Sequence, residues 1–347
     1  MATSVIGLDI GTTRVRGLEA QQSRGSVTIQ RYAEVPLPLG AVRDGEAAQQ
    51  DVVVAALRQL WAVGKFSHRD VVMGVGNQRV MVRNLALPRM PLPQLRSSLP
   101  FQVQGTLLVA VEDALLDFYP TRAVTGQDGP MLDGLLVAAT RDTVQANVSA
   151  AEGAGLRPTM VDLNAFALMR AHVNSGLGAR VAALVDIGAS TTNIVVVDET
   201  VPRLVRSIAS GGQTITDAVA AAANTSHAEA EAMKRQVGVG FAVPRELEVA
   251  ADVINHVSQS LVESIRNTFV YYSSNNPGRP VELVVLTGGG AYLTGLGQYL
   301  SSATRLPVAM ADLLKNSSVG RSVGLEQIQG AESTLAVVLG LATAVAA

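Results

Sequence analysis

The sequence has no cysteine, few aromatic residues and almost no net charge. Without cysteine, the chain forms no disulfide, has no thiolate nucleophile and holds no cysteine-ligated zinc. The formal net charge is −2 over 347 residues, so we expect no basic surface for nucleic acid. The four histidines show neither i,i+4 pairing nor acids at ligand spacing, which disfavours a histidine metal site.

Long apolar segments are also missing. The longest apolar tail covers residues 335–347, and its 13 residues are too few to span a bilayer. No basic stretch precedes the first strand-like run, so we expect no signal peptide. These features predict a cytoplasmic protein without direct membrane insertion. A hydrophobic content of 48% over 347 residues is enough for two ordinary α/β domains with full cores.

One pattern occurs twice in what the sequence does contain. Residues 5–19 form an apolar run that carries one acid, Asp9, then a glycine, two threonines and a second strand-like run. Residues 183–198 repeat this order around Asp186. Because Asp9 and Asp186 lie 177 residues apart in a chain of 347, each half begins with the same hairpin. A duplicated domain that closes on one ligand would produce this repeat.

The two acids predict the kind of ligand. A carboxylate in a buried strand needs a hydrogen bond, an ion pair or a cation, because an isolated buried charge is costly. For one hairpin alone, an aspartate that caps its own turn is an equal alternative. The repeat favours a nucleotide whose β- and γ-phosphates contact hydroxyls and N–H groups. Phosphates would repel two bare carboxylates, so Asp9 and Asp186 require Mg²⁺ between them, held through water.

Glycines and a few polar residues mark further sites. Gly211 and Gly212 open a predicted helix, whose first N–H groups suit an anion. Residues 288–290 are three glycines between a buried strand and a predicted helix, where a backbone can lie flat against a ligand. Purely structural turn chemistry is the alternative there. Asp162 and Asn164 either cap a helix or face the γ-phosphate and order water.

Two further segments leave their interpretation open. Glu231 and Lys234 are three residues apart on a predicted helix over 227–237, which on its own indicates an ordinary surface ion pair. Residues 80–155 interrupt the first half with proline-punctuated strands and two helices, which predicts a small α+β subdomain. This subdomain is either an insertion into the parent domain without a binding role or a surface that binds a partner.

The order of these motifs resembles the actin-like ATPases. The Asp9 hairpin, the helix at 161–164, the Asp186 hairpin, the glycines 288–290 and the small-residue helix from Ser333 match the family's phosphate-1, connect-1, phosphate-2, adenosine and connect-2 motifs. The inserted subdomain lies where FtsA and PilM carry theirs. Five runs are similar to the PilM family of type IV pilus assembly ATPases: 82–91, 115–119, 135–141, 151–158 and 161–168.

This resemblance implies an α/β, actin-like ATPase fold of two duplicated ribonuclease-H-like domains with an inserted α+β subdomain. The implied subdomains are 1A (1–83, 153–175 and 331–347), 1C (84–152), 2A (176–213 and 246–330) and 2B (214–245).

The resemblance also implies ATP and Mg²⁺ in the central cleft. Asp9 and Asp186 organise the metal and, with Asp162, are the catalytic candidates. Arg16 stands where the family has a phosphate-reaching lysine, and an arginine can form a fork to phosphate. The implied nucleotide-binding residues are Gly11, Thr12, Thr13, Arg16, Gly188, Ser190, Thr191, Thr192, Gly211, Gly212, Glu231, Lys234, Gly288, Gly289 and Gly290.

The family implies a partner as well. Its members lie at the inner face of the cytoplasmic membrane and bind the cytoplasmic N-terminal tail of PilN in the groove between subdomains 1A and 1C. Residues 104–111 depart from the family's more acidic, Pro-Phe-Pro-like segment, so the local path there is open.

Three functions remain as hypotheses. The favoured one is a nucleotide-gated cytoplasmic adaptor of pilus assembly with slow or negligible turnover. A sugar-type kinase would need a catalytic aspartate that the sequence does not place. An FtsA-like filament anchor would need a basic amphipathic helix at the C-terminus, where this chain has an uncharged helix. Self-association of copies stays open.

Overall fold

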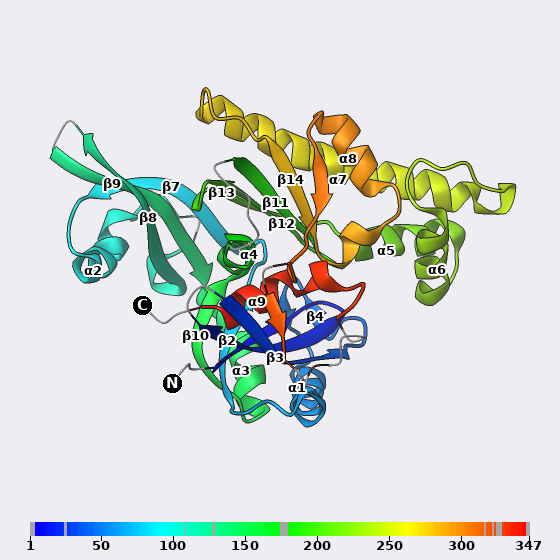
Figure 1. The fold of residues 1–347 in the computed structure, drawn as a ribbon, viewed down its shortest axis with the longest axis horizontal. Coiled ribbons are helices and arrows are strands. Elements are labelled where there is room, and N and C mark those ends of the chain that lie inside the picture. The colour runs from blue at the N-terminus through cyan, green and yellow to red at the C-terminus, as the bar shows by residue number, and fades with distance from the viewer. Residues whose placement is uncertain are drawn as a thin grey trace.

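The computed structural model describes residues 4–23, 26–107, 109–126, 129–173, 180–315, 317–320, 323 and 328–344. Two α/β halves meet at a pair of central helices, and a smaller unit is attached to the first half (Figure 1). Among the described residues, no helix combines the length and the apolar character needed to cross a membrane.

The first half is built on a six-stranded sheet in the order β10-β6-β1-β2-β3-β16. Side chains alternate along β1: Ile6, Leu8 and Ile10 lie in a buried cluster with residues of α1, while Gly7 faces α9. The bounds are β1 (Ser4–Ile10), β2 (Arg14–Ser23), β3 (Ser26–Pro36), β4 (Val42–Arg43), β5 (Glu46–Ala47), α1 (Gln50–Gly64), β6 (Asp70–Val75), β10 (Arg157–Leu163) and β16 (Ser317–Val319).

The second half repeats this topology in a five-stranded sheet, β13-β12-β11-β14-β15. In both halves three antiparallel strands joined by hairpins are followed by two parallel strands, so β3-β2-β1-β6-β10 corresponds to β13-β12-β11-β14-β15. The bounds are β11 (Val181–Ile187), β12 (Thr192–Asp198), β13 (Val201–Ile208), α5 (Gly212–Ala223), α6 (His227–Val237), η2 (Arg245–Leu247), α7 (Glu248–Asn275), β14 (Leu283–Thr287), η3 (Gly289–Tyr292), α8 (Leu296–Thr304) and β15 (Val308–Met310). The predicted duplication is therefore confirmed.

The third unit is the predicted insertion. It contains the three-stranded antiparallel sheet β7-β9-β8, with α2 packed against β8 over a small core of its own. The following helix, α3, contacts both β9 and α1. The bounds are β7 (Val80–Pro88), α2 (Leu92–Gln102), η1 (Val111–Asp113), β8 (Ala114–Gly126), β9 (Gly129–Thr140) and α3 (Arg141–Gly153). The subdomain boundaries stay a prediction, and the boundary at 175 and 176 and residue 108 of the departing segment lie outside the described residues.

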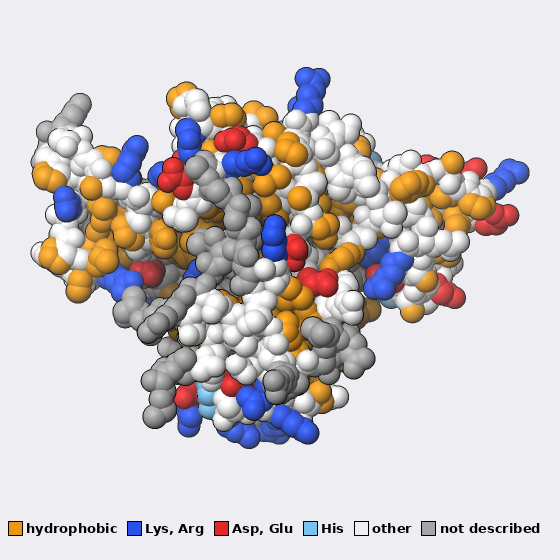
Figure 2. All heavy atoms as spheres, in the orientation of Figure 1, with side chains coloured by type: hydrophobic (Ala, Val, Ile, Leu, Met, Phe, Trp, Pro, Cys, Tyr) orange, Lys and Arg blue, Asp and Glu red, His pale blue; other side chains and the backbone are white. Residues whose placement is uncertain are grey.

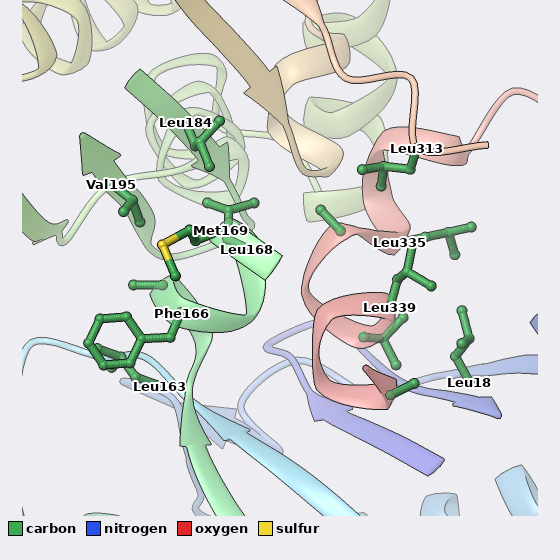
Figure 3. Close-up of a cluster of buried hydrophobic side chains, with 14 of the residues drawn as sticks. Leu18, Leu163, Phe166, Leu168, Met169, Leu184, Val195, Leu313, Leu335 and Leu339 are labelled. Carbon is green, nitrogen blue, oxygen red and sulfur yellow. The ribbon is translucent and has the colours of Figure 1, made fainter. Parts of the chain in front are cut away.

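Two helices lie between the halves: α4 (Asn164–Val173) and α9 (Ala336–Ala342), which follows η5 (Glu332–Leu335). They cross so closely that a Cβ added at Gly340 would lie 1.8 Å from the carbonyl oxygen of Ala167. Figure 3 shows side chains of both helices between Leu18 of the first sheet and Leu184 of the second. The two halves thus share one buried cluster, and the small residues of the last helix allow this close helix contact.

Candidate functional site

The two predicted hairpin turns touch each other. The hydroxyl of Thr12 lies 2.6 Å from the hydroxyl of Ser190 in a hydrogen bond that joins the two halves. The turns are also built alike. The N–H of Gly11 donates to the carbonyl of Arg14 at 3.0 Å, and the N–H of Gly188 donates to that of Thr191 at 2.9 Å.

The register of the hairpins places the two acids at equivalent positions. Asp9 lies opposite Arg16 in the β1–β2 pair, and Asp186 lies opposite Asn193 in the β11–β12 pair. The repeat of hairpin, turn and acid that the sequence shows is therefore also a repeat in space, with both copies at one place between the halves.

Burial makes the charges of the two acids costly. It raises the pKa of Asp9, although the nearby Arg16 guanidinium acts in the opposite direction. For Asp186, burial first and the charge of Asp9 second raise the pKa to about 6, against the opposing effects of Arg16 and a hydrogen bond from Asn193. Because the charge of Asp9 acts on Asp186 and Arg16 acts on both, the two acids share one environment that is short of positive charge.

This pair fits a hydrated magnesium ion. Within the described ranges, no group of three or more histidine, cysteine, aspartate or glutamate side chains lies at metal-binding spacing. Mg²⁺ keeps several waters and is commonly held by one or two carboxylates together with substrate phosphates. Asp9 and Asp186 have the oxygen ligands that such a site needs, so they could hold the ion through water.

Arg16 is already engaged by acids. Its Nη1 lies 3.3 Å from Asp9 Oδ2 and its Nε lies 3.3 Å from Glu34 Oε2. Thr13, in the same turn, accepts a hydrogen bond on its carbonyl from the N–H of Leu37 at 2.8 Å. The structure therefore brings the predicted phosphate-reaching arginine beside Asp9, one of the two acids predicted to organise a metal.

Several predicted donors of the second half serve internal contacts. The N–H of Gly212 donates to the carbonyl of Gly188 at 3.0 Å, and the N–H of Gly211 donates to the Thr214 hydroxyl at 3.1 Å. The hydroxyl of Thr192 donates to the carbonyl of Ser210 at 2.7 Å. These contacts fix the start of α5 to the second hairpin turn, so in this structure Gly211 and Gly212 allow close packing and their N–H groups do not face an anion.

The triple glycine lies against the second acid. Gly288 has a φ of 85°, and a Cβ added there would lie 2.5 Å from Asp186 Oδ1. A Cβ at Gly290 would lie 3.0 Å from the carbonyl oxygen of Gly188, whereas one at Gly289 would meet no atom within 4 Å. The run therefore packs closely against the hairpin on one side and leaves space at its middle residue.

The helix predicted directly after these glycines is not there. Residues 289–292 form the short 3₁₀ turn η3, and α8 begins only at Leu296. The backbone N–H groups of an α-helix therefore do not start at the glycine run, and the prediction of a helix N-terminus at this point was wrong. A positive φ at Gly288 and again at Gly295 accounts for the delay, because the chain must turn twice before it can continue as a helix.

Glu231 and Lys234 are not the surface ion pair that their spacing alone indicates. Lys234 is only 8% exposed, and its Nζ donates to Glu231 Oε2 at 2.6 Å, to Thr216 Oγ1 at 2.9 Å and to the carbonyl of Gly212 at 3.0 Å. Burial raises the pKa of Glu231, but hydrogen bonds from Lys234, Thr216 and Arg235 outweigh it and lower the pKa overall. The pair ties α6 to the first turn of α5 beside the glycines.

Asp162 is bound to a partner that sequence reasoning missed. It forms an ion pair with Arg170 of α4 and accepts a hydrogen bond from the N–H of Leu163 at 2.8 Å. Arg170 in turn donates to the carbonyl of Gly340 at 3.1 Å. Since β6 lies between β10 and β1, Asp162 is two strands from Asp9, about 10 Å at the usual strand spacing.

Asn164, the other polar residue predicted here, begins α4 and has a side-chain acceptor without a hydrogen bond among the described residues. The Oδ1 of Asn164 is buried and accepts no hydrogen bond from the described residues. A Cβ added at Gly74, on β6, would lie 2.0 Å from that oxygen, so the amide lies over the strand next to β1. This oxygen therefore keeps an acceptor position that none of the described groups uses.

The duplicated sheets, with paired acidic hairpins where the halves meet, define the actin-like ATPase fold. The family model "Type IV pilus assembly protein PilM" matches residues 7–345, so the chain belongs to the PilM family of type IV pilus assembly proteins. Both the fold and the family predicted from the sequence are confirmed.

Solved structures agree with this assignment. The chain is similar to the PilM-PilN type IV pilus biogenesis complex, at 25% identity and a TM-score of 0.84, covering 99% of this chain and 98% of that chain. It is also similar to the ethanolamine utilization protein EutJ from Carboxydothermus hydrogenoformans, at 17% identity and a TM-score of 0.56 over 99% and 90% of the two chains. MreB5 of Spiroplasma citri bound to ADP matches at 13% identity and a TM-score of 0.53 over 97% and 94%. The last two matches show the shared fold.

Proposed function

We propose that the chain is a cytoplasmic ATP-binding adaptor of type IV pilus assembly, held at the inner face of the membrane by PilN. One observation supports nucleotide binding most directly: the Thr12–Ser190 hydrogen bond brings the two hairpin turns and their acids to one place. Solved MreB5 structures contain ADP and AMPPNP, which are ligands of that protein. A nucleotide between equivalent turns would explain why this chain retains both.

The residues present suit Mg²⁺-ATP. Asp9 and Asp186 would hold the ion, and the turn residues Thr12 and Ser190 would contact phosphate oxygens. The open space beside Gly289 would accommodate the ribose of the nucleotide. Bound Mg²⁺ would neutralise phosphate charge beside the two carboxylates. The other predicted positions, Gly11, Thr13, Gly188 and Thr191 among them, form the same turns.

We expect slow or negligible turnover. A hydrolytic site needs a group that orients the attacking water. Asp162, the acid predicted for this role, is held by Arg170. Asn164 has an oxygen that can accept a hydrogen bond from water, but an amide does not take up a proton at neutral pH.

Isothermal titration calorimetry tests the nucleotide site. Asp186→Asn should abolish or strongly weaken Mg²⁺-ATP binding, because it removes one of the two charges that the ion requires. Asp198→Asn is the matched control: Asp198 ends the adjacent strand β12, where it pairs with Arg279 and Arg203. Equal affinity of the Asp186→Asn variant and the wild type would reject the site.

The partner is proposed from family membership and from the similarity to the solved PilM-PilN complex. The third unit supports a peptide-binding role because it exposes large apolar side chains, and hydrophobic atoms are prominent over it in Figure 2. Phe101 on α2 is 79% exposed, the largest exposure among them; Leu92, Val109 and Leu115 are the others. The groove between this unit and the first sheet is the proposed site for the PilN tail.

A synthetic PilN tail peptide with a photoreactive residue tests the groove. Cross-links to both the first half and the third unit are expected, whereas cross-links confined to the second half would contradict the assignment. Phe101→Ser should weaken capture of the peptide. Phe241→Ser, which changes a 52% exposed phenylalanine on the second half, should leave it unchanged.

A further inference from the structure

Three charged side chains form a row across adjacent strands at the first hairpin. Asp9 on β1 lies opposite Arg16 on β2, and Arg16 lies opposite Glu34 on β3. Arg16 contacts both acids, with Nη1 3.3 Å from Asp9 Oδ2 and Nε 3.3 Å from Glu34 Oε2. The side chains of Arg16 and Asp9 are 15% and 14% exposed, so the contact between them is largely shielded from water, whereas Glu34 is 35% exposed.

Arg16 is the counter-ion of the metal-binding acids. Its charge lowers the pKa of Asp9 and that of Asp186, against the larger effect of burial on both. Without a divalent ion, this one guanidinium partly compensates the negative charge of the two carboxylates. A metal that arrives with a nucleotide would take over this compensation and leave Arg16 available to a phosphate oxygen.

Glu34 is held beside Arg16 by several hydrogen bonds. Its carboxylate accepts hydrogen bonds from the hydroxyl of Tyr32 at 2.8 Å and from Arg14, in addition to the contact with Arg16. These partners come from two strands and keep the carboxylate beside β2. Glu34 is 35% exposed and lies one strand further from the proposed metal site than Arg16 does. It is therefore not one of the acids proposed to bind the metal.

We propose that Glu34 is a positioning residue that holds Arg16 beside Asp9 and thereby lowers the affinity for nucleotide. This inference rests on the proposed nucleotide site. A guanidinium has five N–H donors, and Arg16 offers those at Nε and Nη1 to the two acids. Because the Glu34 carboxylate compensates part of the guanidinium charge, a phosphate that binds the remaining donors of Arg16 gains less from charge assistance than it would from a free arginine.

Calorimetric titration of Mg²⁺-ATP into four forms of the full chain tests the proposal. Glu34→Gln keeps the shape and a hydrogen-bond acceptor but removes the charge, and it should tighten binding about two- to fivefold, the size of one partly exposed ion pair. Arg16→Gln should weaken binding about ten- to a hundredfold, as expected for the loss of a charge-assisted hydrogen bond. The double variant should bind like Arg16→Gln alone, because Glu34 acts through Arg16.

The double variant separates this mechanism from simple repulsion. If Glu34→Gln still tightens binding when Arg16 is absent, the carboxylate acts on the phosphates directly and the proposal is overturned. Weaker or unchanged binding by Glu34→Gln in the wild-type background overturns it as well. Asp133→Asn is the matched control, since Asp133 is 32% exposed and pairs with Arg122 on the third unit. It should leave the affinity unchanged.

The failure of this proposal can be told from failure of the nucleotide site. If the wild type binds Mg²⁺-ATP and Asp186→Asn does not, the site stands and only the role of Glu34 is in question. If the wild type and all variants bind no nucleotide, both proposals fall. Thermal unfolding of each variant without ligand checks the fold, and a Glu34→Asp variant, which restores the charge, should return the affinity toward the wild-type value.

Discussion

Replacing Asp186 by asparagine should make the ligand-free protein more stable at neutral pH. Burial and the nearby charge of Asp9 raise the pKa of Asp186 from 3.8 to about 6. At neutral pH the folded state therefore contains an ionised carboxylate whose charge lowers its stability. At about 1.4 kcal/mol for each unit of pKa, this rise corresponds to about 3 kcal/mol. Since the side chain keeps partial contact with solvent, we expect a gain of about 1–3 kcal/mol.

The pH dependence follows from the direction of the change. A carboxyl group whose pKa is raised by folding destabilises the protein only where it must ionise. The penalty is therefore absent below pH 3.8, grows as the pH rises, and is complete above about pH 6. The stability difference between Asp186→Asn and the wild type should be about half as large at pH 5 as at pH 8.

Urea unfolding at a series of pH values, without metal or nucleotide, measures this difference. Asp198→Asn is the control with the opposite sign, because Asp198 is paired with Arg203 and Arg279 and its loss should lower stability. An Asp186→Asn variant that is less stable than the wild type at pH 8, or whose advantage does not vary with pH, would refute the reasoning. A stabilising variant that loses ligand binding would identify Asp186 as a charge kept for function.

Three further outcomes are expected. Gly340→Ala should lower the thermal midpoint by an amount equivalent to about 1–3 kcal/mol, because the new methyl group would lie 1.8 Å from the Ala167 carbonyl oxygen. Lys234→Met should weaken Mg²⁺-ATP binding in calorimetry by about tenfold, since it removes two hydrogen bonds that join α6 to α5 and a third to Glu231 within α6. Thr287→Val should cost about 1 kcal/mol in urea unfolding, because the buried Thr287 hydroxyl donates to the carbonyl of Ser333.

Matched controls distinguish these effects from generic damage. Gly289→Ala adds a methyl group where no atom lies within 4 Å, so its thermal midpoint should equal that of the wild type, in contrast to Gly340→Ala. Lys65→Met removes a lysine from the end of α1, in the first half, and should leave nucleotide affinity unchanged. For Thr287→Val, Thr304→Val is the comparison: the Thr304 hydroxyl donates only within α8, to the carbonyl of Leu300.

The sequence predicted those parts of the site that local patterns encode. An acid within an apolar run, followed by glycine and hydroxyl residues, specifies a hairpin and its turn, and the second copy at half-chain spacing predicts that the two meet. The small-residue helix from Ser333 was recognised because its residue types are visible in the sequence itself. These features depend on residues near one another in the chain, so the pattern of residue types was sufficient.

Features that depend on register or on long-range pairing could not be predicted in this way. Glu34 lies opposite Arg16 only because of how β3 pairs with β2, and several registers were compatible with the same run of residues. The ion pair of Asp162 with Arg170 joins a strand to the helix that follows it, whereas the sequence offered helix capping or a place near the γ-phosphate. The N–H groups of Gly211 and Gly212 were expected to face an anion, but the first donates to the Thr214 hydroxyl in the same helix start and the second to the distant Gly188 carbonyl.

The glycine run and the central helices are connected by hydrogen bonds, which links the nucleotide site to the contact between the halves. The carbonyl of Ser333, just before α9, accepts hydrogen bonds from the N–H of Gly288 at 3.2 Å and from the Thr287 hydroxyl. Within α9, the carbonyl of Gly340 accepts from Arg170 of α4. Because α9 also packs against the first sheet at Gly7, a displacement of the glycine run toward a ligand would have to move α9 against both α4 and that sheet. If a nucleotide binds between the hairpins as proposed, its binding would therefore be coupled to the relative position of the two halves. In an adaptor, this coupling would let the nucleotide change how a partner is held on the first half.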